Sequence, residues 1–219
     1  MSRSGESKNQ RMRIRIAQVA ARLMSEHGIR DYYIAKQKAA AQLGVADTRN
    51  LPRNEEIESA RIEYQRLFKA RQQAAHLHYL RETALQAMQL LSAYNPRLVG
   101  PVLTGSAGTY DAVTLHLFAD TPEEIAFTLM ENGIPFRTDE YHLRLNGSER
   151  SFPGYRFIRE NTDIELVVFP ASGIRQAPTS PVDGKPMHRA SSHKVKALLE
   201  ERCNGVSGEG EDPVFHEQP

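Results

Sequence analysis

The spacing of apolar residues divides the chain into a helical front part and a strand-rich back part. Up to residue 95, apolar residues recur every three or four positions, as the run from Leu77 to Leu91 illustrates, and this spacing is typical of amphipathic helices. We predict helices over about 11–28, 31–44, 54–68 and 74–94. Asn95-Pro96 ends the last of them, because a proline disfavours the helical conformation of the residue before it.

After residue 96 apolar and polar residues alternate over short runs, which is typical of half-buried β-strands. The predicted strands are Leu98–Thr104, Val113–Phe118, Tyr141–Leu145, Tyr155–Ile158 and Asp163–Phe169, with helices over about 121–132 and 189–202. Asn146-Gly147 is a hairpin signal between two of the strands. The pattern therefore predicts an α+β fold, in which an N-terminal helical domain precedes a mixed β-sheet with flanking helices.

These elements suggest four segments along the chain. We expect a disordered N-terminus over 1–10, a helical domain over 11–95, an α+β domain over 96–202 and a disordered tail over 203–219. The tail is acidic: it contains four Asp or Glu residues after position 203 and no Lys or Arg.

Composition narrows the class of protein. The 219 residues are 40% hydrophobic, which is enough for a packed core. A single cysteine excludes an internal disulfide framework and a cysteine-rich zinc site. No apolar run has the length of a membrane span or of a secretory signal, so we expect a cytoplasmic protein without a membrane partner.

The net charge of +1 conceals an asymmetry. Residues 1–73 carry a charge of +7 and residues 74–219 a charge of −6. A basic front part is compatible with a nucleic-acid partner, but we favour solvated helix faces, because the positive charges are spread over several helices. The basic residues that keep the nucleic-acid alternative open are Arg11, Arg13, Arg15, Lys36 and Lys38.

One segment carries a motif. Two predicted strands flank the small-residue turn that begins at Gly105-Ser106, and a later strand carries Asp163 and Glu165 on one face. This order resembles the DNA polymerase beta-like nucleotidyltransferase superfamily, over about residues 96–170. In that superfamily a Gly-Ser turn lets backbone N–H groups approach the phosphates of a nucleotide, and three strand carboxylates hold two divalent metals.

The resemblance implies a role for each matching residue. Gly105 and Ser106 fit the nucleotide-binding turn, and Glu165 resembles the third acid, although an ordinary charge on a half-buried strand has the same pattern. The two paired acid positions fall on Ala112 and Thr114, which leaves Asp111 as the nearest carboxylate. The candidate catalytic residues are thus Asp111 and Glu165, and the candidate metal ligands are Asp111, Asp163 and Glu165 for Mg²⁺ if the protein is active.

The loop before the last helix supplies two further candidates. Lys185 and Arg189 would contact phosphate if the loop lay beside the Gly-Ser turn, and otherwise they belong to a solvated connection. His116 shares the strand face of Thr114, where we expect a half-buried, hydrogen-bonded imidazole.

Three functions follow from these residues. The first is a nucleotidyltransferase-like protein with an eroded metal site, which binds a nucleotide, another phosphate ligand or a protein partner and acts as a regulatory or scaffolding unit. The second is an active nucleotidyltransferase that uses Mg²⁺ to move a nucleoside monophosphate to an acceptor. The third is a nucleic-acid-binding protein that works through its basic helices.

Overall fold

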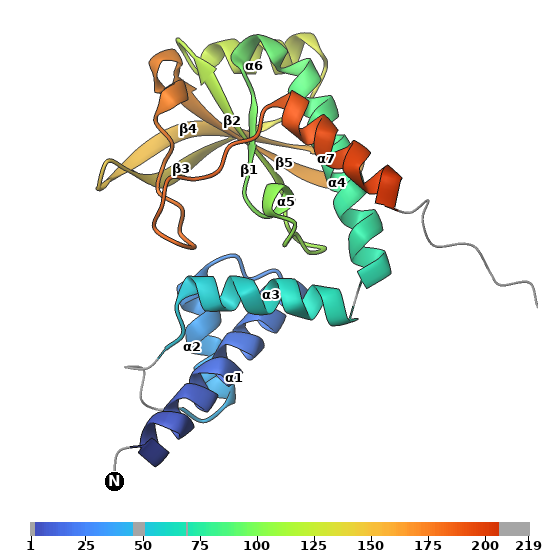
Figure 1. Ribbon diagram of the computed structural model, residues 1–219. Coiled ribbons are helices and arrows are strands. Elements are labelled where there is room, and N and C mark those ends of the chain that lie inside the picture. Colours follow the sequence, from blue (N-terminus) through green and yellow to red (C-terminus); the bar gives the residue numbers. More distant parts are fainter. Residues whose placement is uncertain (1–2, 46–50, 69, 206–219) are drawn as a thin grey trace, which may run out of the picture.

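The computed structural model describes residues 3–45, 51–68 and 70–205, and it has the predicted α+β class. The elements are α1 (Arg3–His27), α2 (Tyr32–Gln42), α3 (Asn54–Phe68), α4 (Ala70–Leu90), η2 (Ser92–Tyr94), β1 (Arg97–Val99), α5 (Pro101–Thr104), β2 (Val113–Ala119), α6 (Glu123–Glu131), β3 (Arg137–Leu145), β4 (Ser148–Arg159), β5 (Thr162–Pro170), η3 (Ala171–Arg175) and α7 (Ser192–Gly205). Figure 1 shows α1, α2 and α3 grouped on one side of the sheet unit. No helix within the described ranges is long and apolar enough to cross a membrane.

The five strands form one mixed sheet in the order β1-β2-β5-β4-β3. Strands β2 and β5 are parallel, and the other neighbours are antiparallel. The predicted hairpin joins β3 to β4, with Asn146 and Gly147 both at positive φ, as the tight turn requires. The strand parity read from the sequence is confirmed, since the apolar residues Val113, Leu115 and Leu117 are all buried in one cluster.

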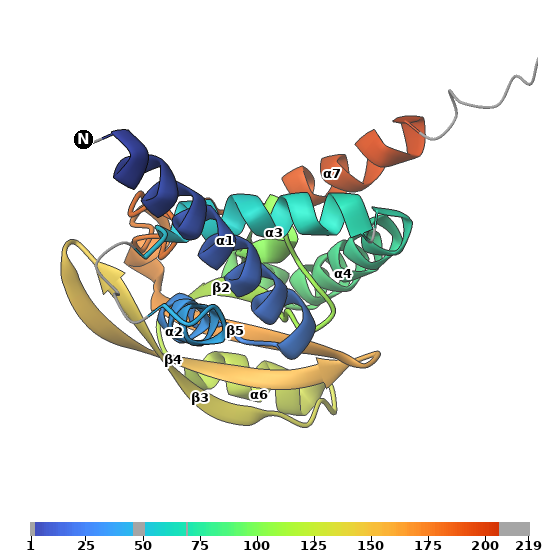
Figure 2. The same cartoon turned by 90° about the horizontal axis from the view of Figure 1, so that it is seen from below.

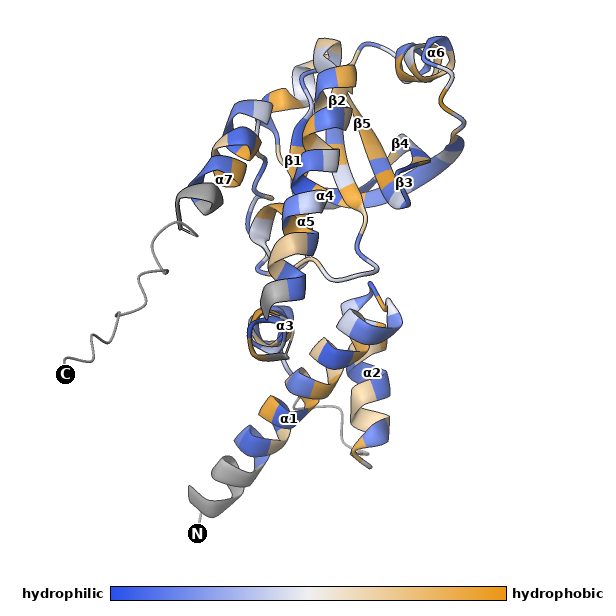
Figure 3. Cartoon of the chain, turned by 90° about the vertical axis from the view of Figure 1, so that its right-hand side faces the viewer, coloured by the Kyte–Doolittle hydropathy of each residue, from blue (hydrophilic) through white to orange (hydrophobic). Residues whose placement is uncertain are grey.

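The two faces of the sheet are covered differently. One face packs against α4, α6 and α7 and forms the largest apolar cluster, which includes Leu115, Leu166 and Val195. The opposite face has a smaller aromatic cluster at one end, built around Phe118 and Phe169. Figure 3 shows β5 mostly in the hydrophobic colour and the exposed strand β3 mostly in the hydrophilic one.

Helices α1, α2 and α3 form their own apolar cluster, and we call them the helical unit. Small residues such as Ala20, Ala21 and Ala39 have no more than a trace of exposed surface, so the helices approach closely. Asp31 caps α2 by accepting a hydrogen bond from the backbone N–H of Ile34, at 2.9 Å.

Three boundaries differ from the sequence prediction. Helix α1 already begins at Arg3, so residues 3–10 continue the first helix; this stretch contains no proline that would prevent it. The buried residues of α4, such as Leu80 and Leu91, belong to the apolar cluster of the sheet and not to that of α1, α2 and α3, so the helical unit ends with α3. Helix α7 extends to Gly205, and the rest of the predicted acidic tail lies outside the described residues.

The predicted strand over Leu98–Thr104 is only partly correct. Residues Arg97–Val99 are a strand, but Pro101–Thr104 form the single helical turn α5. Gly100 has a φ of 72°, which turns the chain out of the strand, and Pro101 occupies the first helical position. The Gly-Ser turn therefore follows a helical turn and not a strand.

Candidate functional site

The candidate site lies where the helical unit meets the sheet unit. Figures 1 and 2 place the helical unit against the end of the sheet that carries α5 and the loop before β2. Arg30, in the turn between α1 and α2, donates hydrogen bonds to Glu165 Oε1 at 2.5 Å and to the carbonyl of Tyr110 at 3.1 Å. The Arg30 guanidinium therefore joins Glu165, the third predicted acid, to the loop that follows the Gly-Ser turn.

Glu165 is the centre of this site. It is 7% exposed and stands on β5 between Thr114 of β2 and Arg156 of β4, which are its partners in register. Arg30 and Arg156 both form ion pairs with its carboxylate, and the Thr114 hydroxyl donates to Oε2 at 3.4 Å. The hydrogen bond to Glu165 raises the pKa of the Arg156 guanidinium. Two arginines therefore share one buried carboxylate, and the exposed Asp163 is a further negative charge near Arg156.

Asp111 has a structural ion pair instead of a free carboxylate. Its Oδ2 accepts hydrogen bonds from Arg61 Nη2 at 2.7 Å and from the backbone N–H of Gly108 at 2.6 Å. The Arg61 side chain is 3% exposed, and Glu58 lies 3.5 Å from it. Burial alone would lower the pKa of this guanidinium, but the neighbouring Asp111 and Glu58 carboxylates raise it overall. Asp111 thus joins α3 to the loop before β2.

The acids available do not fit a pair of Mg²⁺ ions. Ala112 and Thr114 supply no carboxylate, and two of the three candidate carboxylates, Asp111 and Glu165, are bound to arginines. Asp163 shares the β5 face of Glu165 but is exposed. Its negative charge helps to raise the pKa of the nearby Arg156 guanidinium. Within the described residues no group of three His, Cys, Asp or Glu side chains is placed to hold a metal.

The Gly-Ser turn is covered by the helical unit. Gly105 has a φ of 90°, a left-handed conformation that favours glycine. Ser106 is fully buried, and its carbonyl accepts hydrogen bonds from Arg61 Nη2 at 3.0 Å and Gln65 Nε2 at 2.7 Å. Both donors come from α3, so the helical unit stands where a ligand of this turn would lie.

Three backbone amides of the turn, those of Gly105, Ala107 and Gly108, are also hydrogen-bonded within the protein. The N–H groups of Gly105 and Ala107 both donate to the carbonyl of Pro101, at 2.9 and 3.2 Å, and the N–H of Gly108 donates to Asp111. Of these three residues, Gly105 is one of the pair, Gly105 and Ser106, that is predicted to bind phosphate. Internal acceptors satisfy them in this conformation, because the helical turn α5 brings the Pro101 carbonyl underneath.

The contacts of Arg189 lie at the aromatic cluster of the sheet and not at the Gly-Ser turn. Lys185 is exposed, while Arg189 stacks on the rings of Phe118 and Phe169, with its guanidinium carbon 5.0 and 4.9 Å from their centroids. Its Nε donates to His116 Nδ1 at 3.0 Å. His116 is fully buried rather than half-buried, and burial, aided by the charge of Arg189, lowers its imidazole pKa to about 3. This cluster fixes the loop before α7 to the sheet.

A second pair of polar groups completes the site around Glu165. The Tyr141 ring lies over Gly154, where a Cβ would approach ring carbons to 2.5 Å, so only glycine leaves room for it. The Tyr141 hydroxyl and Arg156 Nε are buried without a hydrogen-bond partner in the structure. Burial, and then the negative charge of Glu165, raise the pKa of Tyr141. The Tyr141 hydroxyl and Arg156 Nε therefore have no hydrogen-bond partner, whereas the Glu165 carboxylate near them is already paired with arginines.

Sequence reasoning missed the arginines of this site. Arg156 lies opposite Glu165 only because β4 and β5 pair in that register, and Arg30 and Arg61 arrive from another unit of the fold. The alternation along β4 could have placed Arg156 on the face of Glu165, but no local pattern connects residue 30 with residue 165.

No family model and no curated protein matches this chain. The class of protein is therefore defined by its own fold and site: an α+β protein with a helical unit docked by arginines onto the end of a five-stranded mixed sheet.

Proposed function

We propose that this chain is a nucleotidyltransferase-like protein with an eroded metal site, which binds a nucleotide or a related phosphate ligand without metal and acts as a regulatory or scaffolding unit. The observation that carries the proposal is the arginine pair at Glu165. Arg30 and Arg156 are both paired with Glu165, the carboxylate that the resemblance makes the third metal ligand, and their side chains are 43% and 39% exposed. Guanidinium groups with free N–H donors bind phosphate oxygens in a bidentate manner.

The unsatisfied donors support the same proposal. Arg156 Nε and the Tyr141 hydroxyl are buried without partners, and such groups cost free energy unless a ligand or water satisfies them. Each of them can donate to a phosphate oxygen once the site opens, since both atoms are closed to solvent in this conformation. Because the cations come from the protein itself, no Mg²⁺ is needed to offset the charge of the phosphate.

This proposal and the active-enzyme alternative predict opposite effects of Glu165→Gln. In a metal-free anion site the Glu165 carboxylate competes with the ligand for both arginines, so its neutralisation should strengthen nucleotide binding by roughly tenfold. In a two-metal enzyme the same change removes a ligand of Mg²⁺ and should abolish metal-dependent binding and transfer.

The experiment is calorimetric titration of ATP and GTP into the full chain, with EDTA in one series and Mg²⁺ in the other. We expect binding that is as strong in EDTA as in Mg²⁺ and is lost in Arg156→Met. Arg150→Met is the matched control, since Arg150 is an exposed arginine on the same strand β4. Binding that requires Mg²⁺, or weaker binding by Glu165→Gln, would overturn the proposal, and so would no heat with either nucleotide.

A further inference from the structure

An exposed tyrosine lies beside the arginine pair at Glu165. Tyr110 is 56% exposed and belongs to the loop between α5 and β2. Its carbonyl accepts a hydrogen bond from Arg30 Nη2 at 3.1 Å, while Nη1 of the same guanidinium donates to Glu165 at 2.5 Å. A single arginine side chain therefore connects the backbone of Tyr110 with the carboxylate at the centre of the site.

The Tyr110 side chain packs on the turn that carries Arg30. Gly28, which follows α1, has a φ of 66°, and a Cβ at this position would lie 3.3 Å from both Cβ and Cγ of Tyr110. Because glycine has no side chain, the tyrosine can lie directly against the backbone of the turn. Arg30 follows two residues later. The turn between α1 and α2 thus supports the aromatic ring and also supplies the guanidinium.

This combination of groups suits one class of ligand. An aromatic ring with an open side is a surface on which a nucleobase stacks, and an arginine binds phosphate oxygens. A nucleotide carries its base and its phosphates on the same sugar, so it can contact the ring and the arginines at once. An inorganic phosphate or a polyphosphate can contact only the arginines.

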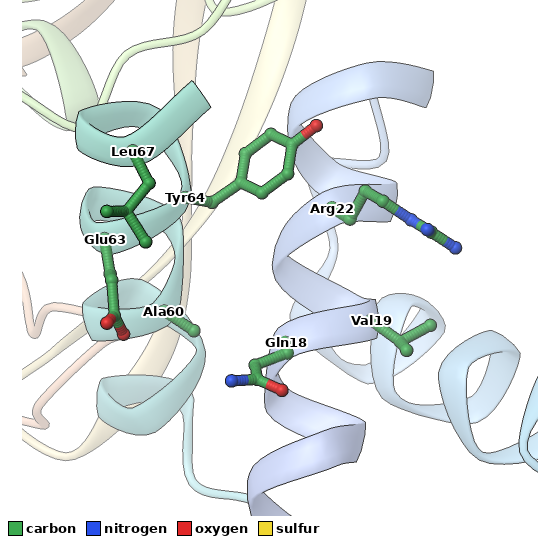
Figure 4. A pocket seen from close by; sticks show the side chains of 7 residues that line it. All are labelled: Gln18, Val19, Arg22, Ala60, Glu63, Tyr64 and Leu67. Carbon is green, nitrogen blue, oxygen red and sulfur yellow. The ribbon is translucent and has the colours of Figure 1, made fainter. Parts of the chain in front are cut away.

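The groove between α1 and α3 lacks this combination, although a tyrosine lines it too. It encloses about 380 Å³, and Arg22, Glu63 and Tyr64 are among the residues that line it. Figure 4 shows Tyr64 reaching from α3 toward α1, with Arg22 on α1 and Glu63 on α3. The Tyr64 hydroxyl donates to Glu26, which brings a second carboxylate beside the groove. Two carboxylates and one arginine make this hollow unfavourable for a phosphate.

We propose that the ligand of the arginine pair is a nucleoside phosphate whose base stacks on Tyr110. This inference rests on the proposed function, in which Arg30 and Arg156 bind the phosphates. Tyr110 then supplies the interaction that separates a nucleotide from an inorganic phosphate. Stacking depends on the face of a base and not on its edge, so ATP and GTP bind with similar strength.

The experiment compares ATP with inorganic tripolyphosphate, which has three linked phosphates but neither base nor sugar. Each ligand is titrated by calorimetry into the full chain in the presence of EDTA. Tyr110→Ala should weaken ATP binding by about tenfold, because it removes the stacking surface, and should leave tripolyphosphate binding unchanged. Tyr110→Phe keeps the ring and should bind ATP like the wild type.

Phe127→Ala is the matched control. Phe127 is a 62% exposed aromatic residue on α6, which packs with Leu166 on the face of the sheet opposite Glu165. Its truncation should change the binding of neither ligand. Unchanged tripolyphosphate binding by Tyr110→Ala also shows that this variant keeps its fold.

The outcomes separate this inference from the function on which it rests. If neither ATP nor tripolyphosphate binds, the phosphate site is wrong and the stacking is overturned with it. If tripolyphosphate binds but Tyr110→Ala leaves ATP binding unchanged, or weakens both ligands equally, only the stacking is overturned. Binding of a single-stranded oligouridylate that is tighter than that of ATP and is lost in Tyr110→Ala would assign the ring to a nucleic-acid strand instead.

Discussion

Asp111 offers the sharpest test of the difference between a structural and a metal-binding carboxylate. In the structure it neutralises Arg61, whose side chain is 3% exposed, and it accepts the N–H of Gly108. Asp111→Ala would leave the buried guanidinium with Glu58 at 3.5 Å and the carbonyl of Ser106. The protein should lose stability, because an uncompensated buried charge is expensive.

The magnitude follows from the surroundings of the pair. Breaking a buried ion pair by removing one partner costs about 3–5 kcal/mol. The Asp111 side chain is 17% exposed and Glu58 remains nearby, so we expect a loss of about 2–4 kcal/mol in the free energy of unfolding. Asp111→Asn keeps an acceptor for Gly108 and should lose less.

The assay is equilibrium unfolding in urea, followed by circular dichroism, with a double-mutant cycle between Asp111→Ala and Arg61→Leu. Asp163→Ala is the matched control, since this exposed aspartate should change the stability by no more than about 0.5 kcal/mol. A coupling of about 1–3 kcal/mol is expected for the pair.

An unchanged or higher free energy of unfolding in Asp111→Ala would refute the structural role of this ion pair. Carboxylates that are gathered to hold metal repel one another when no metal is bound, so removing one of them from such a site leaves the apoprotein equally stable or more stable. If Asp111→Ala were as stable as the wild type, or were no different from Asp163→Ala, the ion pair with Arg61 would not be structural.

Three further outcomes are expected. The neutral His116 has a folded-state pKa of about 3, below its unfolded value of 6.5, so its contribution to stability is complete above pH 6.5 and is lost as the pH falls toward 3. The free energy of unfolding of the wild type should therefore be about 2 kcal/mol lower at pH 5 than at pH 7. Urea unfolding of His116→Gln should show a smaller loss over the same pH range. Gly154→Ala should lower the melting temperature by several degrees, because its Cβ would lie 2.2 Å from the Leu166 carbonyl oxygen, and unchanged melting would contradict the strand geometry. Arg189→Met should increase proteolysis of the loop before α7, whereas the exposed Lys185→Ala should cleave like the wild type.

The docking of the helical unit links the site to the rest of the molecule. Arg30 and Arg61 both come from this unit, and both contact acids at the end of the sheet. A ligand that draws Arg30 away from Glu165 would therefore also change how the two units are held together. This coupling is the physical basis of the proposed regulatory role.

The sequence by itself determined the elements and their faces. The parity of Val113 to Phe118 and of Asp163 to Phe169 correctly assigned which residues share a face of each strand, because the alternation of a strand has a period of two whatever its neighbours are. It did not show that both faces of these two strands are buried. The α+β order and the Asn146-Gly147 hairpin were equally local properties.

Only the tertiary structure decided what the candidate residues do. The sequence could not assign Arg30 to Glu165, Arg61 to Asp111 or α4 to the sheet, since each depends on segments that meet from distant parts of the chain. Nor could it foresee that α3 covers Ser106. The charge of a site depends on every residue that the fold brings to it, and the pattern within one segment shows only the residues of that segment.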